Sequence, residues 1–347
     1  MSEDRADGTD GRGNSGNEAD ETDDGEITRR RMLLGGGASL ATIGGVRAIY
    51  NTILGYGQLG MGTNLEDQDV ESVATEHLTP RYDEEIQGTR VQADTNAVFV
   101  GDEWVSFETG TADEAADLDV EFGLDGRFQS LFADLSAFHA DEYAFEFHDP
   151  ATFFERFGDG DPRAEVVTAM RRYADRTVDP AVVERFTGED PAAIDALVEG
   201  LVRGFRKHTD YDVPRYLAGS VEDNVIFGAV DLRKYFEDDV SFEALLDAGE
   251  TGIFCWELVY RSIEALQALR PIEQSVPVAA CYVSDRRHKH AFTGLVGALR
   301  VDGDLRFPMT FLDYTHTTMY DDFRLTGILG EGLAAYDDSH RADEIYW

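Results

Sequence analysis

The sequence predicts a protein of the α+β class, and three patterns carry this prediction. Residues 111–210 place apolar side chains three and four positions apart, which is the spacing of amphipathic helices. Residues 276–312 contain β-type apolar runs, and Asp302-Gly303 is a typical turn between two strands of a hairpin. A shorter hairpin is expected over residues 97–107. The chain should therefore combine a mostly helical N-terminal half with an antiparallel sheet in its C-terminal half.

Local signals mark several helix ends. An acid before a proline suits the start of a helix, because the acid can accept a bond from a backbone N–H group and proline is tolerated in the first turn. Such Asp-Pro pairs occur at 149–150, 161–162, 179–180 and 190–191. A further short helix is expected from Ser241 to Ala248, ended by Gly249.

The composition excludes several partners. The chain has 347 residues, with 69 acidic and 30 basic side chains, a formal net charge of −39 and only three lysines. Such a surface repels nucleic acids and anionic membranes, and it disfavours a strongly anionic substrate. A carboxylate-rich surface stays hydrated where salt screens its self-repulsion, and in this respect the chain resembles the proteins of extreme halophiles. Hydrophobic residues still make up 42% of the chain, which is enough for a core.

The N-terminal segment is predicted to contain an export signal rather than part of the fold. Residues 1–27 hold ten acids and few large apolar side chains, so they are expected to form a disordered leader. Residues 28–62 begin with arginines and continue into a glycine-rich, mildly apolar run. Arg29 and Arg30 before Met32 resemble a twin-arginine signal, the kind that exports folded proteins. The mature chain is therefore expected outside the cell.

The sequence leaves open whether this signal is removed. No small-residue cleavage site stands out, although the stretch from Gly60 to Thr63 is a candidate boundary. Arg47 and many glycines interrupt the apolar run, so the run makes a poor transmembrane helix. The protein could be extracellular, or it could be held at the membrane by an uncleaved anchor and face outside.

Replacing Arg29 and Arg30 by lysine is expected to retain the protein in the cytoplasm, because the paired arginines define this kind of signal. Cell fractionation followed by immunoblotting would measure the distribution, with Arg5→Lys in the acidic leader as the control. Normal export of the double-lysine variant would contradict the signal.

Three residues in the C-terminal half form a candidate catalytic set. Cys255 opens a helix-like run after Gly252, so its thiol should lie at a helix start, where N–H groups and the helix dipole favour a thiolate. His290 begins a β-type run, and Asp313 ends the strand that returns from the hairpin. The hairpin should bring the imidazole beside the carboxylate, as a base and the acid that orients it require. A nucleophile, a base and an orienting acid in this order indicate acyl transfer.

This pattern resembles the transglutaminase-like superfamily, relatives of the papain-like cysteine proteases. The motifs that carry the resemblance are Cys255-Trp256, His290-Ala291-Phe292 and Asp313-Tyr314-Thr315. The resemblance covers residues 240–316 and implies a helix with the cysteine, packed on an antiparallel sheet with the histidine and the aspartate. By resemblance, Cys255 is the nucleophile, His290 is the base and Asp313 fixes the imidazole.

The resemblance also divides the chain. Residues 211–347 are expected to form the transglutaminase-like domain, whereas residues 64–210 form a mostly helical region without an assigned role. The family usually carries a glycine two residues before the cysteine, whereas here Gly252 stands three residues before Cys255 and Phe254 adjoins it. Backbone N–H groups at the helix start could form half of an oxyanion hole, and Trp256 and Asn224 are the candidates for supporting it.

The function implied is that of an exported cysteine-dependent enzyme, which most simply hydrolyses amide bonds in a protein or peptide. Transfer of the acyl group to an amine stays open, and so does a non-catalytic cell-surface module that keeps the fold.

No cofactor and no metal ion are expected. His139, Glu142 and His148 suggest a metal site but lack the two-histidine spacing of a helical metal motif, so surface or capping roles are favoured. The oligomeric state is not predicted.

Neighbouring residues offer alternatives within the candidate set. His288 and His316 compete with His290 for the role of the base. A disulfide between Cys255 and Cys281 would consume both thiols of the chain, and an oxidising exterior would permit it. The mid-strand position of Cys281 favours a place in the core instead.

Overall fold

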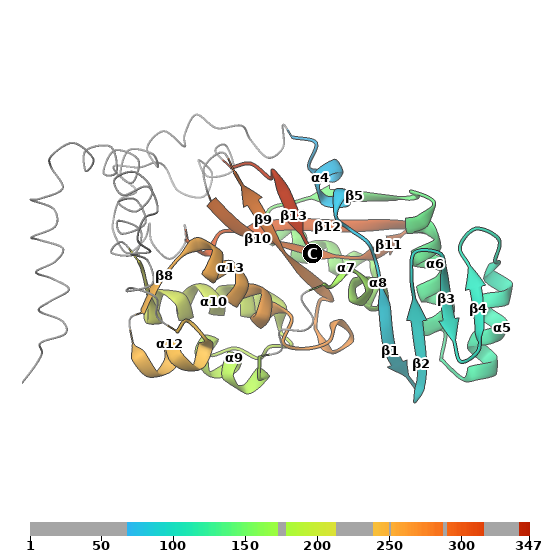
Figure 1. The fold of residues 1–347 in the computed structure, drawn as a ribbon, viewed down its shortest axis with the longest axis horizontal. Helices are drawn as coiled ribbons and strands as arrows, with labels where there is room; N and C mark the ends of the chain where they lie inside the picture. The colour runs from blue at the N-terminus through green and yellow to red at the C-terminus, as the bar shows by residue number, and fades with distance from the viewer. Residues whose placement is uncertain (1–67, 173–177, 213–238, 250, 287–289, 316–339) are drawn as a thin grey trace, which may run out of the picture. The chain divides into compact units, whose positions relative to one another are not determined.

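The computed structural model describes residues 68–172, 178–212, 239–249, 251–286, 290–315 and 340–347 (Figure 1). Within these residues the protein is an α+β structure with antiparallel sheets, as predicted. The acidic leader, the signal segment, Asn224, His288 and His316 lie outside the described residues. In the described part of the chain, no helix is both long and apolar enough to cross a bilayer.

The main sheet is built around three long antiparallel strands. In spatial order its strands are β13 (Glu344–Tyr346), β9 (Val278–Asp285), β10 (His290–Gly297), β12 (Asp304–Leu312), β11 (Leu299–Val301) and β6 (Asp161–Pro162). β10 and β11 follow one another along one side of β12, and β5 (Tyr143–Phe147) lies parallel along the other side. β13, drawn in red in Figure 1, pairs with β9.

The predicted turn joins β11 to β12 and completes the central hairpin. Asp302 and Gly303 have φ values of 53° and 95°, and a two-residue type I′ turn requires positive φ at both positions. The hairpin is therefore confirmed. Its register pairs Thr293 with Leu312, which determines the side chains that meet at this end of the sheet.

The N-terminal half contains more β structure than the sequence predicts. The hairpin expected over residues 97–107 is present as β3 (Ala97–Val100) and β4 (Glu103–Ser106). It belongs to a four-stranded sheet that also contains β1 (Tyr82–Ile86) and β2 (Thr89–Ala93). These two strands bury alternate residues, but charged side chains on their exposed face hide the apolar pattern.

Most of residues 111–210 is helical, as predicted. The helices are α5 (Ala112–Phe122), α6 (Arg127–His139), α7 (Pro150–Asp159), α8 (Ala164–Met170), α9 (Pro180–Thr187) and α10 (Ile194–His208). β5 is the exception, because this aromatic strand lies within the helical region and joins the main sheet.

Two of the four Asp-Pro pairs begin helices. Asp149 and Asp179 cap α7 and α9 by accepting hydrogen bonds from backbone N–H groups. The other two predictions are wrong: at Asp161 the chain forms β6 against β11, and at Asp190 it forms a turn. Because of this strand pairing and this turn, α8 and α10 begin a few residues later in the sequence than the Asp-Pro pairs predict.

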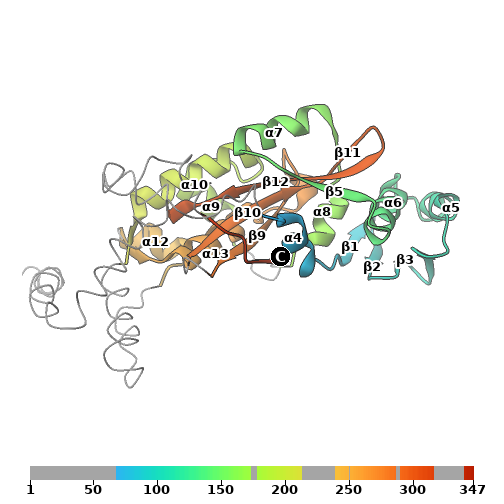
Figure 2. The same cartoon turned by 90° about the horizontal axis from the view of Figure 1, so that it is seen from above.

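The main sheet lies between two apolar cores. On β10, Phe292 and Val296 belong to the first core, and Ala291 and Leu295 belong to the second, as the alternation of a strand requires. The first core includes side chains from β1–β4, α6, α8 and the short helix α4 (Val70–Glu76). The second core is formed with α7, α9, α10, α12 (Phe242–Ala248) and α13 (Cys255–Leu266). α9, α10, α12 and α13 lie close together in both views (Figures 1 and 2).

The sequence predicts a domain boundary at residue 211, but both apolar cores contain side chains from each side of this boundary. All described residues belong to one compact unit, Ala48–Trp347. The expected division therefore does not coincide with a division of the core.

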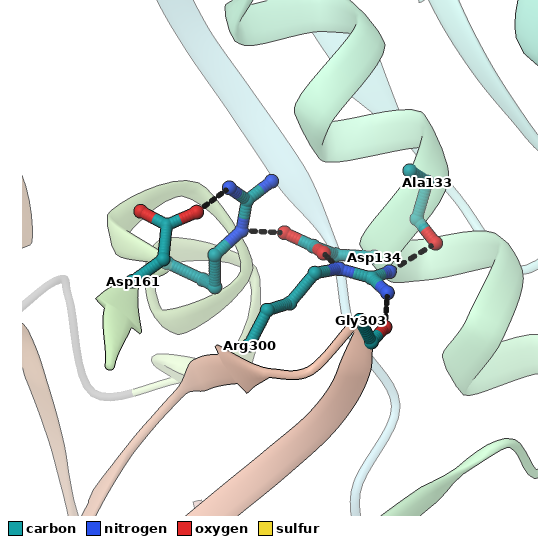
Figure 3. Close-up of polar contacts among 6 residues, drawn as sticks. Ala133, Asp134, Asp161, Arg300 and Gly303 are labelled. Atoms are coloured by element: carbon teal, nitrogen blue, oxygen red, sulfur yellow. Dashed lines mark hydrogen bonds and ion pairs between the residues drawn. The ribbon is translucent and has the colours of Figure 1, made fainter. Parts of the chain in front are cut away.

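A buried ion cluster links the helical region to the central hairpin. Asp134 in α6 accepts hydrogen bonds from Nε of Arg163 and from Nε of Arg300, both at 2.8 Å (Figure 3). Arg300, which lies in β11, also donates to the carbonyl oxygen of Ala133 at 3.0 Å. Only 1% of the Asp134 side chain is exposed. The hairpin that carries Asp313 is thus fastened to α6 by a buried carboxylate.

Candidate active site

Cys255 is the first residue of α13, as predicted. The N-cap residue Phe254 donates its backbone N–H to Glu257 Oε2 at 2.8 Å. The Phe254 side chain has no oxygen that could accept a bond from the first-turn N–H groups, as a serine or aspartate cap would. The buried carboxylate of Glu257 lies in the first turn, where the helix dipole favours negative charge. The half-buried thiol therefore lies at the helix end that favours an anion.

Just before the cysteine, the backbone of one glycine lies very close to the side chain of a neighbouring residue, and this contact positions the chain. β8 (Thr251–Ile253) pairs parallel with β7 (Thr209–Tyr211), which directly follows α10. A Cβ atom at Gly252 would lie 2.8 Å from Cγ of Asp212, a buried residue that no sequence motif singles out. A larger residue would push β8 away and displace Cys255, so packing requires glycine here.

His290 and Asp313 meet at the ends of neighbouring strands. His290 begins β10, and Asp313 directly follows β12. His290 Nε2 and Asp313 Oδ2 are hydrogen-bonded, and only 8% and 1% of these two side chains are exposed. If the antiparallel register that pairs Thr293 with Leu312 is continued, Phe292 lies opposite Asp313, and His290 is then the diagonal neighbour of Asp313 on the same face.

The imidazole of His290 also interacts with Cys255. Since Nε2 bonds Asp313, Nδ1 is the ring nitrogen that remains for the thiol. Burial alone would lower the pKa of His290, but Asp313 and then Cys255 outweigh it and hold this pKa well above its ordinary value. A protonated imidazole is therefore favoured here, and it is the neighbour that stabilises a thiolate. The structure brings the three predicted residues together.

Buried hydrogen bonds fix the cysteine helix on the histidine strand. Ser262 Oγ in α13 and Thr293 Oγ1 in β10 are 2.6 Å apart, and both residues are fully buried. Gln267 Oε1 accepts a bond from the N–H of Ala280 in β9 at 3.2 Å. These contacts hold α13 against the sheet, so Cys255 is positioned by rigid elements rather than by a loop.

A further side chain, His340, joins the cluster. Its Nε2 lies 3.7 Å from Asp313 Oδ2, and its ring meets those of His290 and Phe292 edge-on at 5.3 and 5.5 Å. His340 is buried, and it precedes the edge strand β13. Sequence reasoning missed it because it lies outside residues 240–316 and belongs to no motif. The apolar alternation of the strand after it is the signal that could have drawn attention to this segment.

Trp256 is partly exposed, whereas Cys281 is fully buried. The Trp256 side chain is 40% exposed and meets the ring of Tyr260 at 6.0 Å, so this indole lies at the surface. Cys281 is fully buried in β9, and burial raises the pKa of its thiol. Both cysteines are free thiols, so the alternative of a disulfide between Cys255 and Cys281 is not realised in this structure.

The metal-binding alternative from the sequence is not assembled among the described residues. The ring of His139 packs against Phe107 at 5.8 Å, whereas His148 Nε2 lies 3.5 Å from Glu146 Oε2. The two histidines therefore contact different residues, which agrees with separate roles for each of them. A different set could hold a metal ion: His290, Asp313 and His340 offer ligand atoms within 4.8 Å of one another.

No protein-family model, no curated protein and no solved structure matches the chain. A fold class alone does not determine a function, so the function has to be argued from the site.

Proposed function

We propose that this chain is an exported, transglutaminase-like enzyme in which Cys255 transfers acyl groups, most simply to water. The observation that carries the proposal is that one buried imidazole, His290, contacts both the Cys255 thiol and the Asp313 carboxylate. A helix that begins at the cysteine and packs on β10, the antiparallel strand of the histidine, and on its neighbour β9 supports the family resemblance. The two contacts of His290 point to acyl transfer, and the α+β class is compatible with it.

The first half of the reaction acylates the enzyme. The Cys255 thiolate attacks the carbonyl carbon of an amide or ester, and the carbonyl electron pair moves to the oxygen. N–H groups at the start of α13 stabilise the resulting oxyanion. As the intermediate collapses, His290 Nδ1 donates its proton to the leaving amine or alcohol, and a thioester remains on Cys255. Asp313 accepts the bond from His290 Nε2 and keeps Nδ1 directed at the sulfur.

The second half returns the enzyme to its starting state. His290 Nδ1 takes a proton from water while the water oxygen attacks the thioester carbonyl. Collapse of this second intermediate releases the carboxylic acid and restores the Cys255 thiolate beside a protonated His290. An amine in place of water would form a new amide by the same steps, so the acceptor decides between hydrolase and transferase.

The proposed substrate is a protein or peptide met outside the cell. The net charge of −39 repels strongly anionic chains, so neutral or cationic segments would approach the site more readily. The proposal involves no cofactor and no nucleic acid, and a membrane enters only through an uncleaved N-terminal anchor.

Alkylation by iodoacetamide tests the reactive pair without knowledge of the substrate. Cys255 should react faster at neutral pH than a free thiol such as N-acetylcysteine, because an unassisted thiol is only a few per cent thiolate there. His290→Ala should slow this labelling by about tenfold or more, since it removes the cationic partner. Mass spectrometry of the Cys255 peptide would give the rate, in high salt to suit the acidic surface. Cys281 is buried and provides an unreactive internal reference.

The matched control is His139→Ala, which removes an exposed histidine outside the cluster and should leave the rate unchanged. If Cys255 reacts no faster than the free thiol, and His290→Ala does not change its rate, the chain is better explained as a non-catalytic surface module.

A further inference from the structure

Three metal-binding side chains gather on the side of His290 that faces away from Cys255. His290 Nε2, an oxygen of Asp313 and a ring nitrogen of His340 lie within 4.8 Å of one another. Asp313 Oδ2 is their common neighbour, because it bonds His290 and lies 3.7 Å from His340 Nε2. The proposed acyl transfer uses His290 and Asp313 but gives His340 no role. Two imidazoles and one carboxylate are, however, a common protein ligand set for zinc with one open position.

The spacing suits a zinc ion after a small local shift. Zn–N and Zn–O bonds of about 2.0–2.1 Å place the ligand atoms of a tetrahedral site about 3.4 Å apart. The separation of 3.7 Å between Asp313 Oδ2 and His340 Nε2 is already close to that value. The hydrogen-bonded pair of His290 and Asp313 would have to open by roughly 1 Å to admit the ion.

Burial strengthens the case for a specific site. The exposed fractions of the His290, Asp313 and His340 side chains are 8%, 1% and 4%. Water screens charges poorly in such a place, so a buried carboxylate attracts a divalent cation strongly. The ligands also come from β10, from the end of β12 and from the segment before β13, which pairs with β9 in the same sheet. The paired strands hold the donors in place before an ion arrives.

We propose that Zn²⁺, or a similar divalent transition-metal ion, binds His290, Asp313 and His340 and thereby switches off the thiol chemistry of Cys255. The switch rests on the proposed function, whereas the metal site does not. The ion takes the place of the proton between His290 Nε2 and Asp313, and that proton leaves to solvent. Metallated at Nε2, the ring carries its one remaining proton on Nδ1 and cannot accept another. His290 can then no longer serve Cys255 as a base.

Calorimetric titration of the full chain with zinc chloride in high salt is the first test. The wild-type chain should bind one ion at the site, and Cys255→Ala should bind it equally well, because the thiol is not a ligand. His340→Gln should weaken binding by more than about 100-fold, since even residues behind the ligands alter affinity by about 10–100-fold. His139→Gln, which changes an exposed histidine, should bind zinc as the wild type does.

Two further readouts separate the metal site from the catalytic proposal. Cobalt(II) in place of zinc should give a visible spectrum without a thiolate-to-metal charge-transfer band. Zinc should slow the turnover of a p-nitrophenyl ester, which needs His290 Nδ1 as a base, in the wild type but not in His340→Gln. Circular dichroism would verify that each variant is folded.

The outcomes distinguish the two ideas. Unchanged zinc affinity in His340→Gln, or a thiolate band with cobalt, would overturn the proposed site in favour of a Cys255–His290 pair as ligands. Slow alkylation of metal-free wild type would count against the catalytic proposal alone, because calorimetry measures the metal site independently.

Discussion

Asp313→Ala is expected to reduce the turnover of an activated ester by about 10²–10⁴-fold, because an unoriented imidazole transfers protons poorly. Asp313→Asn should retain considerably more activity than Asp313→Ala. The asparagine oxygen can accept the same bond from His290 Nε2–H, as the Cys-His-Asn sites of papain-like proteases illustrate. Hydrolysis of a p-nitrophenyl ester in high salt, followed by absorbance, measures kcat for each variant.

The matched control for this comparison is Asp304→Asn at the start of the same strand. Asp304 is exposed and pairs only with Arg306 among the contacts described, so its amide variant should keep wild-type kcat. A kcat that decreases from the wild type to Asp313→Asn and again to Asp313→Ala indicates that Asp313 orients the imidazole. Equal turnover in the wild type and Asp313→Ala would show that the carboxylate does not act on His290.

Asp134→Ala is expected to produce a large loss of stability although it lies outside the site. It removes the carboxylate that bonds Arg163 and Arg300, whose side chains are only 14% and 23% exposed. Loss of one partner from a buried ion pair typically costs about 3–5 kcal/mol. A value near the lower end is expected here, because Arg163 keeps its ion pair with Asp161 whereas Arg300 loses its carboxylate. Urea denaturation monitored by circular dichroism measures the change in the free energy of unfolding.

Asp83→Ala is the control for that experiment. It removes an ion pair with Arg90 in which both side chains are more than half exposed, so the unfolding midpoint should hardly move. If Asp134→Ala also leaves the midpoint unchanged, the cluster in Figure 3 is not what fastens α6 to the central hairpin.

The positions of the three predicted site residues followed from local patterns. Cys255 precedes a strong helical pattern, and the Asp302-Gly303 turn fixes the hairpin that brings Asp313 to His290. These signals are short-range: a helix start, a two-residue turn and the period of a strand. The sequence alone could therefore predict that the three side chains lie near one another, although their chemistry remains a proposal.

The parts that the sequence could not predict depend on distant pairing. β5 places aromatic residues at alternate positions, which is a strand pattern, but five residues among helical segments are too few to decide. It becomes a strand because β12 offers an open side along Leu305 to Met309. His340 reaches Asp313 through the pairing of β13 with β9, and the short apolar alternation of β13 does not indicate its partner strand. Asp212 is likewise placed beside Gly252 only when β7 pairs with β8. In all three cases, contacts between residues that are distant in the sequence decide the arrangement.

The most direct test of the central claim is to trap the acyl-enzyme. The wild-type chain and Cys255→Ala would be treated in high salt with an ester probe that leaves a stable acyl group on a reactive thiol, and intact-protein and peptide mass spectrometry would locate the adduct. A single acyl group on the Cys255 peptide of the wild type, absent from Cys255→Ala and strongly reduced in His290→Ala, is the predicted result. An adduct that persists in Cys255→Ala, or a wild-type chain that stays unmodified, would contradict the proposal that Cys255 is the nucleophile.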